Sequence, residues 1–155
     1  MTLQSLSPPA SESRRIAMGV LARAQRTELE ASLGAHWPNL DCRVLRQPET
    51  GLVMLRGRIG GDGAAFNLGE ATVSRAVIEL PTGERGYGQV LGRDREHARL
   101  AAILDALWQK PETNEVVETS VLRPIRQRLA TETAQTSAET AATRVDFFTL
   151  VRGED

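Results

Sequence analysis

Two arginines and a histidine gather where a helix is predicted to begin, and this is the chain's best candidate for an anion site. Arg93 and Arg95 flank Asp94, and His97 follows two positions later. Backbone N–H groups at a helix N-terminus attract negative charge, and arginine forks bind phosphate bidentately. Alternatively, Asp94 caps the helix itself, which leaves both arginines in solvent and His97 as a hydrogen-bonded packing residue. We favour the capped helix end and keep the phosphate site as the second hypothesis.

Other segments that could do chemistry are weaker candidates. The glycine-rich residues 57–63 could cradle a phosphate, but no Lys-Ser or Lys-Thr follows them, so a plain hairpin turn is favoured. Residues 86–92 differ from a dinucleotide fingerprint because the last glycine comes one position late. Apart from carboxylates, the only possible metal ligands are His36, His97 and Cys42, and their spacing matches no known metal-binding pattern. The sequence therefore predicts no catalytic residues, no metal and no cofactor of the chain's own.

Composition narrows the class of protein. The chain has 155 residues and a formal net charge of -1, which indicates one domain with flexible ends and argues against nucleic-acid binding by charge. No run approaches the ~20 apolar residues that span a membrane. Cys42 is the single cysteine, which indicates a reduced, partly buried thiol and a cytoplasmic protein. All basic residues except Lys110 are arginine, which suits interfaces or anion sites, although a GC-rich genome would produce the same bias.

A hairpin followed by a helix, from Glu70 to Trp108, is predicted to organise the fold. The segment 81–84, Pro-Thr-Gly-Glu, suits a tight turn between two short strands. The helix of about 95–109 carries large apolar residues on one stripe and alanines on most of the rest, so it is buried on more than one side. We expect its second side to meet another chain. The partner contacts expected there are Ala98, Ala101, Ala102 and Asp105, with Asp105 paired to an arginine if it is buried.

The preceding segments complete an α+β prediction: a meandering antiparallel sheet packed against helices, with the core domain at residues 13–110. Residues 1–12 are predicted to be a disordered leader, with Ser13 capping the first helix and Thr27 and Glu30 forming a capping box for the second. A brief strand at 42–46 and a turn at 48–51 precede a strand at 52–59. That strand is apolar on both faces, so we expect it at the centre of the sheet.

Residues 111–155 are predicted to serve assembly, as a polar loop at 112–119, a helix from Ile125 to about Thr140 and an apolar tail. The helix has a thin apolar stripe and is marginal alone. The tail holds Phe147, Phe148 and Leu150, and alternation puts large apolar groups on both of its sides. It either completes the parent sheet or docks on a partner. We favour sharing with a partner, or exchange between copies when the protein is alone.

Four stretches together resemble one known family. They are Glu49-Thr50-Gly51-Leu52-Val53; Phe66 through Gly69-Glu70-Ala71-Thr72 to Arg75-Ala76; Gly86-Tyr87 with Val90-Leu91-Gly92-Arg93-Asp94 to His97-Ala98 and Asp105-Ala106-Leu107; and Arg144-Val145-Asp146-Phe147-Phe148-Thr149 to Val151-Arg152-Gly153. Their order and spacing resemble PhnG, the G subunit of the bacterial carbon–phosphorus lyase system, from about Arg14 onward. Glu70 stands where aspartate is expected, and the leader differs.

The resemblance implies a part in using phosphonates as a phosphorus source. G subunits assemble with the H, I and J subunits, with G against I. With I, H and L they support displacement of adenine from MgATP by methylphosphonate, which yields α-D-ribose 1-methylphosphonate 5-triphosphate. A radical S-adenosylmethionine subunit later breaks the carbon–phosphorus bond. The nucleosidase chemistry is attributed to I, and the resemblance carries no catalytic residue over to this chain.

Two functions are therefore expected as alternatives. The favoured one is a non-catalytic, structural and allosteric subunit of the transferase complex. The other is a subunit that donates phosphate-binding residues to a shared active site, with Arg93, Arg95 and His97 as the donors.

Overall fold

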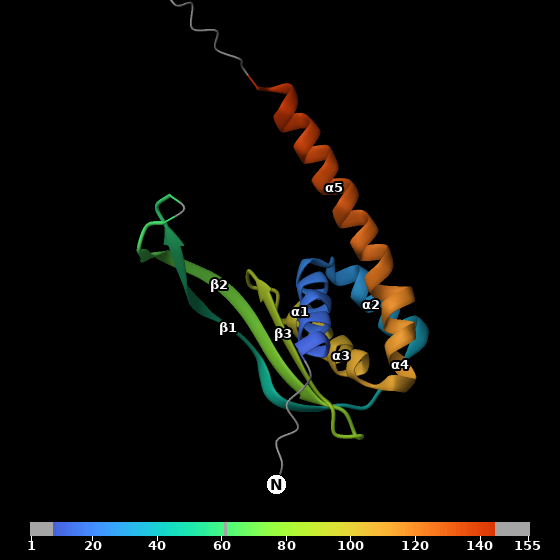
Figure 1. Ribbon diagram of the computed structural model, residues 1–155. Coiled ribbons are helices and arrows are strands. Elements are labelled where there is room, and N and C mark those ends of the chain that lie inside the picture. The colour runs from blue at the N-terminus through green and yellow to red at the C-terminus, as the bar shows by residue number, and fades with distance from the viewer. Residues whose placement is uncertain (1–7, 61, 145–155) are drawn as a thin grey trace, which may run out of the picture.

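The computed structural model describes residues 8–60 and 62–144, in which helices pack against a three-stranded antiparallel sheet of order β1-β2-β3 (Figure 1). This confirms the predicted α+β class. The strands are β1 (Arg43–Arg58), β2 (Ala65–Glu79) and β3 (Arg85–Leu91). The helices are α1 (Pro8–Arg23), α2 (Arg26–His36), α3 (Arg95–Gln109), α4 (Pro111–Val116), the π-helical segment η1 (Val117–Leu122) and α5 (Arg123–Ala142).

The predicted hairpin of β2 and β3 and the start of α3 are confirmed. The Leu80 N–H donates to the Glu84 carbonyl at 2.9 Å, and the Gly83 N–H donates to the Leu80 carbonyl at 2.8 Å. Gly83 has a φ of +101°, which an L side chain rarely adopts, so glycine is required at this place in the turn. Asp94 then caps α3. The hairpin and cap place α3 across the sheet.

Helix α3 lies unusually close to β3 because glycines of the strand face alanines of the helix. A Cβ atom on Gly88 would overlap the carbonyl oxygen of Ala98, and one on Gly86 would overlap that of Ala102. Backbone therefore approaches backbone, with no side chain between them. Because the strand alternates, Gly86, Gly88 and Val90 all face the helix.

This packing corrects the prediction that the alanine side of α3 meets another chain. Ala98, Ala101, Ala102 and Asp105 are all buried inside this chain. The predicted partner is the chain's own strand β3. A helix that is apolar nearly all round must be buried on two sides. Here the sheet buries one side of α3, and helices α1 and α2 bury another.

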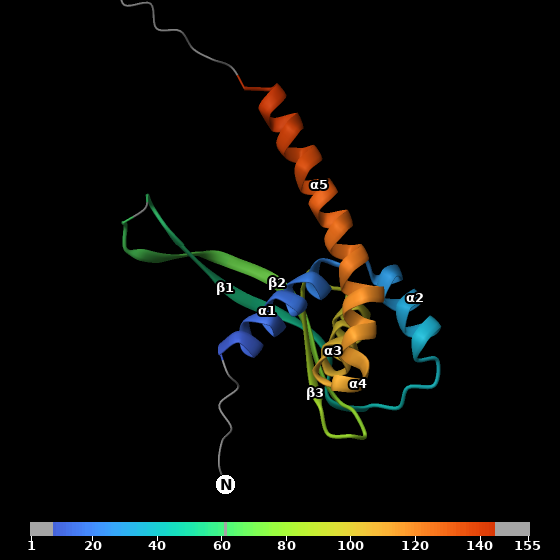
Figure 2. The ribbon, with the colours of Figure 1, turned by 45° about the vertical axis from the view of Figure 1, so that its right-hand side comes forward.

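Strand β1 corrects two further predictions, because it is one continuous strand and lies at the edge of the sheet. The expected turn at 48–51 is instead a set of register irregularities between Val44 and Glu49. Pro48 is tolerated there because an edge strand can lack a ladder donor. Strand β2 takes the central place. Because β3 pairs only with Val73–Glu79, the far halves of β1 and β2 continue beyond it as a two-stranded ribbon (Figures 1 and 2).

The first and last helices also differ from prediction. Helix α1 begins at Pro8, so the expected leader of residues 1–12 is helical from residue 8 onward. The expected polar loop at 112–119 is helical as well, with Pro111 at the start of α4, where its missing N–H costs nothing. Val117, Val121, Leu122 and Ile125 are buried in the core. The core therefore extends past residue 110 to the first turn of α5.

Helix α5 leaves the body and is exposed from Ala130 onward, as its thin apolar stripe predicts (Figure 2). Arg128 fixes its base by donating to both carboxylate oxygens of Glu28 on α2, at 2.7 and 2.9 Å. Glu28 also accepts from the Gln25 N–H at 2.7 Å. The capping box of α2 is therefore Gln25 and Glu28, two positions earlier than predicted. Residues 145–155, including Phe147, Phe148 and Leu150, lie outside the described residues.

The close approach of α3 to β3 predicts that Gly88→Ala destabilises the chain by more than about 2 kcal/mol, because the added methyl group overlaps helix backbone that cannot yield without moving α3. Gly51→Ala in β1 is the matched control, since a Cβ there meets nothing within 4 Å. Urea unfolding followed by circular dichroism measures both. Equal stabilities of the two variants would contradict the close contact.

The tie between α2 and α5 predicts a pH-dependent stability. The hydrogen bonds from Arg128 hold the pKa of Glu28 below its usual range, so the stabilisation is present above the unfolded pKa and disappears as the pH falls. We expect Glu28→Gln, which keeps the capping geometry, to cost about 1 kcal/mol at neutral pH. The difference from the wild type should shrink as the pH falls below about 4.3, the ordinary pKa of glutamate, and disappear once Glu28 is protonated in the folded chain as well. A cost that stays constant across this range in urea titrations would contradict the account.

Candidate functional site

The start of α3, which the sequence singles out as a possible anion site, is occupied by the chain's own carboxylate. Asp94 Oδ1 accepts from the His97 N–H at 2.9 Å, and Asp94 Oδ2 lies 3.7 Å from Arg26 Nη1. Arg93 is exposed, and Arg95 donates through Nε to the Thr50 hydroxyl at 3.3 Å. The capped helix end is therefore the arrangement found.

His97 points into the core and does not join the two arginines at the surface. Its Nε2 lies 2.9 Å from the Leu21 carbonyl oxygen of α1, and the residue is buried. This confirms the interpretation of His97 as a hydrogen-bonded packing residue. The structure thus separates the three predicted phosphate ligands: His97 holds α1 to α3, while Arg93 and Arg95 face solvent.

The one deeply buried carboxylate among the described residues is Asp105, which is only 1% exposed. Arg14 of α1 binds it bidentately, from Nε to Oδ1 at 3.0 Å and from Nη2 to Oδ2 at 2.7 Å. The Tyr87 N–H of β3 donates to Oδ2 at 2.9 Å. The hydrogen bonds from Arg14 to Asp105 raise the pKa of Arg14. The predicted pairing with an arginine is confirmed, and the carboxylate is held by structural donors on two other elements.

The guanidinium of Arg14 makes further contacts that complete this junction. It donates to the Arg85 carbonyl at 3.3 Å and lies over the Tyr87 ring, 5.7 Å from its centroid. Asp105 therefore joins α1, α3 and β3 at one point. Throughout residues 8–60 and 62–144, every buried side-chain nitrogen or oxygen has a hydrogen-bond partner. A group poised for chemistry but left unpaired is thus absent from this part of the chain.

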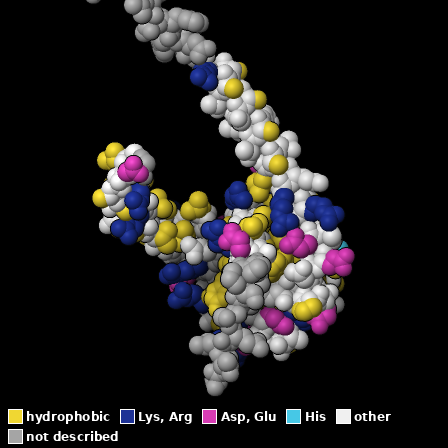
Figure 3. All heavy atoms as spheres, viewed as in Figure 1, with side chains coloured by type: hydrophobic (Ala, Val, Ile, Leu, Met, Phe, Trp, Pro, Cys, Tyr) yellow, Lys and Arg dark blue, Asp and Glu magenta, His cyan; other side chains and the backbone are white. Residues whose placement is uncertain are grey.

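The exposed surface carries apolar side chains that the sequence analysis did not assign to a partner. They concentrate on the β1–β2 ribbon, where Figure 3 shows yellow side chains interleaved with arginines. The exposed ones are Leu52, Met54, Leu55, Phe66 and Leu68 on the two strands and Ile59 in the turn between them. The signal was present in the apolar run 52–55, which the sequence analysis placed at the centre of the sheet. The glycine-rich segment 57–63 leads into the turn of this ribbon, in line with the predicted hairpin turn. Gly57 and Arg58 are still paired in β1, and Gly61 lies outside the described residues.

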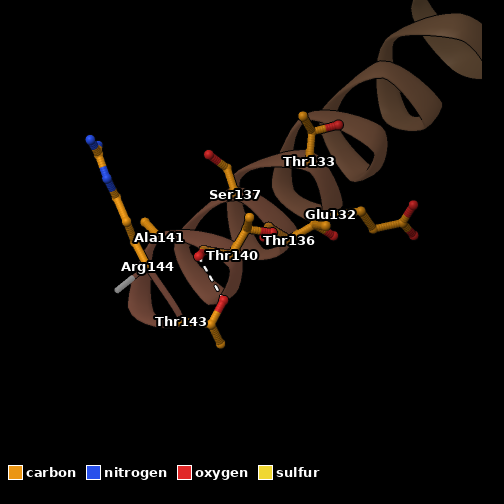
Figure 4. A pocket seen from close by; sticks show the side chains of 8 residues that line it. All are labelled: Glu132, Thr133, Thr136, Ser137, Thr140, Ala141, Thr143 and Arg144. Carbon is orange, nitrogen blue, oxygen red and sulfur yellow. Dashed lines mark hydrogen bonds between the residues drawn. The ribbon is translucent and has the colours of Figure 1, made fainter. Parts of the chain in front are cut away.

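A hollow along the far end of α5 is lined by one helix and its last turn (Figure 4). Its side chains are five hydroxyls, the methyl group of Ala141 and two charged ends, and the Thr143 hydroxyl donates to the Thr140 carbonyl at 2.9 Å. No second element faces it among the described residues, so it is an open surface. In the same part of the chain, no cluster of His, Cys, Asp and Glu could hold a metal. No described helix is long and apolar enough to cross a membrane.

Comparison with known proteins identifies the family. The family model described as "Phosphonate metabolism protein PhnG" matches residues 12–153. The chain belongs to the PhnG family. It is 54% identical over 142 residues to the "Alpha-D-ribose 1-methylphosphonate 5-triphosphate synthase subunit PhnG" of Rhizobium meliloti (strain 1021), covering 92% of this chain and 90% of that protein. The resemblance drawn from the four sequence stretches is confirmed, and the match includes α1 and the C-terminal segment as well as the sheet.

The junction at Asp105 predicts that Asp105→Asn destabilises this PhnG chain by about 3 kcal/mol, because the partly buried guanidinium of Arg14 loses its counter-charge at a buried position. Glu12→Gln is the matched control, since it removes the carboxylate partner of the neighbouring Arg15 at the exposed surface of α1. Chemical denaturation monitored by tryptophan fluorescence measures both. A cost for Asp105→Asn no larger than that of the control would contradict the structural role.

Proposed function

We propose that this chain is a non-catalytic subunit of an α-D-ribose 1-methylphosphonate 5-triphosphate synthase and serves phosphonate catabolism. The observation that carries the proposal is the 54% identity to the PhnG subunit of that synthase across nearly the whole chain. MgATP and methylphosphonate are the substrates of the complex, and this subunit supplies no cofactor of its own. The complex acts in the cytoplasm.

The arrangement of polar groups supports a role without catalysis. Asp94 is committed to capping α3, His97 to the Leu21 carbonyl, and Asp105 to Arg14 and Tyr87. Each candidate acid or base named by the sequence thus has a structural partner. The described chain exposes extended surfaces on α5 and on the β1–β2 ribbon. Such surfaces are available for contacts with other subunits, which is what a supporting subunit requires.

The partners we propose are the H, I, J and L subunits of the carbon–phosphorus lyase system, with I in direct contact. Phe147, Phe148 and Leu150 of the tail remain proposed contacts with a partner, or with a second copy when the chain is isolated. The thin apolar stripe of α5 and its exposure from Ala130 onward support assembly at this end, because so polar a helix is marginal alone.

A second candidate function is the donation of phosphate-binding residues to an active site shared with a partner. Arg93 and Arg95 favour it, because both are exposed and neither forms an ion pair with a carboxylate of the described chain. His97 is a poor third ligand, since its ring is committed to the core. The alternative therefore rests on the two arginines.

One experiment tests both functions. The full chain is co-expressed with the H, I and J subunits as the wild type, as Arg93→Ala with Arg95→Ala, and as Arg15→Ala, an exposed arginine on α1, as the control. We expect all three to co-purify and to support product formation in the presence of L within about twofold of one another. Two lost charged hydrogen bonds to phosphate would instead weaken MgATP binding by about a hundredfold or more. That loss with assembly intact would establish the second function, and failure of the wild type to co-purify would reject the first.

A further inference from the structure

We propose that the β1–β2 ribbon, residues 52–58 and 65–72, is a docking arm that binds an apolar, carboxylate-bearing surface of another protein subunit. The inference deepens the proposed function and rests on it, because it assigns a surface and a chemistry to one of the contacts within the complex. The surface lies apart from the C-terminal segment, and it meets the start of α3 at one residue, Arg95, which reaches its base.

The ribbon extends beyond the layer that covers the rest of the sheet. Strand β3 ends opposite Val73, so within residues 8–60 and 62–144 the preceding part of β2 pairs with β1 alone. Figures 1 and 2 show the ribbon standing away from the helices in both views. A two-stranded ribbon with no layer on either face is marginally stable in water. Its length therefore indicates that something else covers it in the assembled protein.

The ribbon is apolar where solvent alone would favour polar residues. Leu52, Met54, Leu68 and Ile59 are 62, 53, 66 and 79% exposed. Leu52 and Met54 share one face, whereas Leu55 lies on the other face. Phe66 and Leu68 are on that second face too, because both come within 4.0 Å of where a Cβ on Gly57 would lie. Contiguous exposed apolar residues of this kind mark interaction surfaces. Since both faces are apolar, the partner must contact more than one side of the arm.

The charges on one face say what the partner must carry. Alternation along β1 places Thr50, Leu52, Met54, Arg56 and Arg58 on the same face. Arg56 and Arg58 form no ion pair with a carboxylate within the described chain, and Arg58 donates only to the Gly63 carbonyl at 3.2 Å. Ten other arginines in that part of the chain have such a partner.

The same pattern continues at the base of the arm, where Arg95 reaches Thr50. The face therefore has aliphatic side chains in the middle and an arginine at each end. An aliphatic centre with arginines is a typical composition for a protein interface. The complementary surface is apolar with carboxylates placed to meet Arg56, Arg58 and Arg95.

Two other occupants fit the charges less well. A second copy of this chain docked face to face would oppose arginines to arginines, because a two-fold contact uses the same patch twice. A lipid surface would accept the arginines and leucines, but Glu70 stands opposite Met54 in the apolar middle and would enter the bilayer unpaired. A protein partner can supply a cation for Glu70. A carboxylate-bearing subunit is therefore the occupant we propose.

The test uses the full chain co-expressed with the other subunits of the synthase. One variant carries Leu52→Asp and Met54→Asp, and a second carries Arg56→Glu and Arg58→Glu. The controls are Ile16→Asp, an exposed apolar residue on α1, and Arg15→Glu. Since all the substituted side chains are exposed, thermal melting of each isolated chain should stay close to that of the wild type. We expect each ribbon variant to bind the partner subunits at least about tenfold more weakly, and the controls to bind as the wild type does.

The outcomes separate the inference from the function on which it rests. If the wild type does not co-purify with the subunits, the proposed function fails. If the wild type and both ribbon variants co-purify equally, or the controls lose binding as strongly as the ribbon variants, the docking arm is wrong and the proposed function stands. Should the aspartate variant unfold, the arginine reversal alone decides between these outcomes.

A photo-crosslinking side chain in place of Leu68 identifies the occupant in the wild-type complex. A cross-link to another subunit, in a peptide with Asp or Glu beside apolar residues, supports the proposal. A cross-link mainly to a second copy of this chain, or binding of the isolated chain to phosphatidylglycerol vesicles that the ribbon variants abolish, would overturn it.

Discussion

The contact of α3 with β3 is the constraint on which the rest of the structure depends. Glycines at 86 and 88 let the helix backbone approach the strand until no side chain fits between them. At that separation the Asp105 carboxylate of α3 reaches the Tyr87 N–H of β3. Arg14 of α1 then binds both elements, through the Asp105 carboxylate and the Arg85 carbonyl. The position of α1 therefore follows from the small residues of α3 and β3, and the ion pair secures a geometry that the glycines permit.

Because the alanine side of α3 is consumed by the chain's own strand, contacts with partners fall to the elements that leave the body. Among the described residues the ribbon and α5 are such elements, and they differ in composition. The ribbon carries large exposed apolar side chains with arginines, whereas α5 carries mainly hydroxyls, alanines and scattered charges. A core that closes on itself while two projections stay uncovered suits a PhnG subunit whose contribution is contact with other chains.

Local signals in the sequence predicted most of the helices and strands, whereas contacts between residues far apart in the sequence could not be predicted. The turn at Gly83, the cap at Asp94 and the helix after it were correct because each depends on neighbours within a few positions. The burial of Asp105 could be predicted, but its partner Arg14 lies 91 positions away and is one arginine of many. The family, in contrast, followed from short stretches in a fixed order, which need no knowledge of spatial pairing.

The two main errors share one physical cause, which is that apolar composition indicates burial without naming what does the burying. For α3 the sequence suggested a second chain, and the cover was β3; the alternation of Gly86 and Gly88 was the overlooked evidence, since strand glycines admit a close helix. For β1 the sequence suggested neighbouring strands on both sides, yet β1 is an edge strand of the described sheet, and its part from Leu52 onward has exposed apolar residues on both faces. Edge strands that are long and apolar invite pairing with other chains, so natural proteins shorten, charge or cover them. Here the edge strand is long and carries large apolar side chains. Arg56 and Arg58 form no ion pair within the described chain, so they favour a partner surface that carries carboxylates. The misplaced strand is thus consistent with a surface that is completed in the assembly.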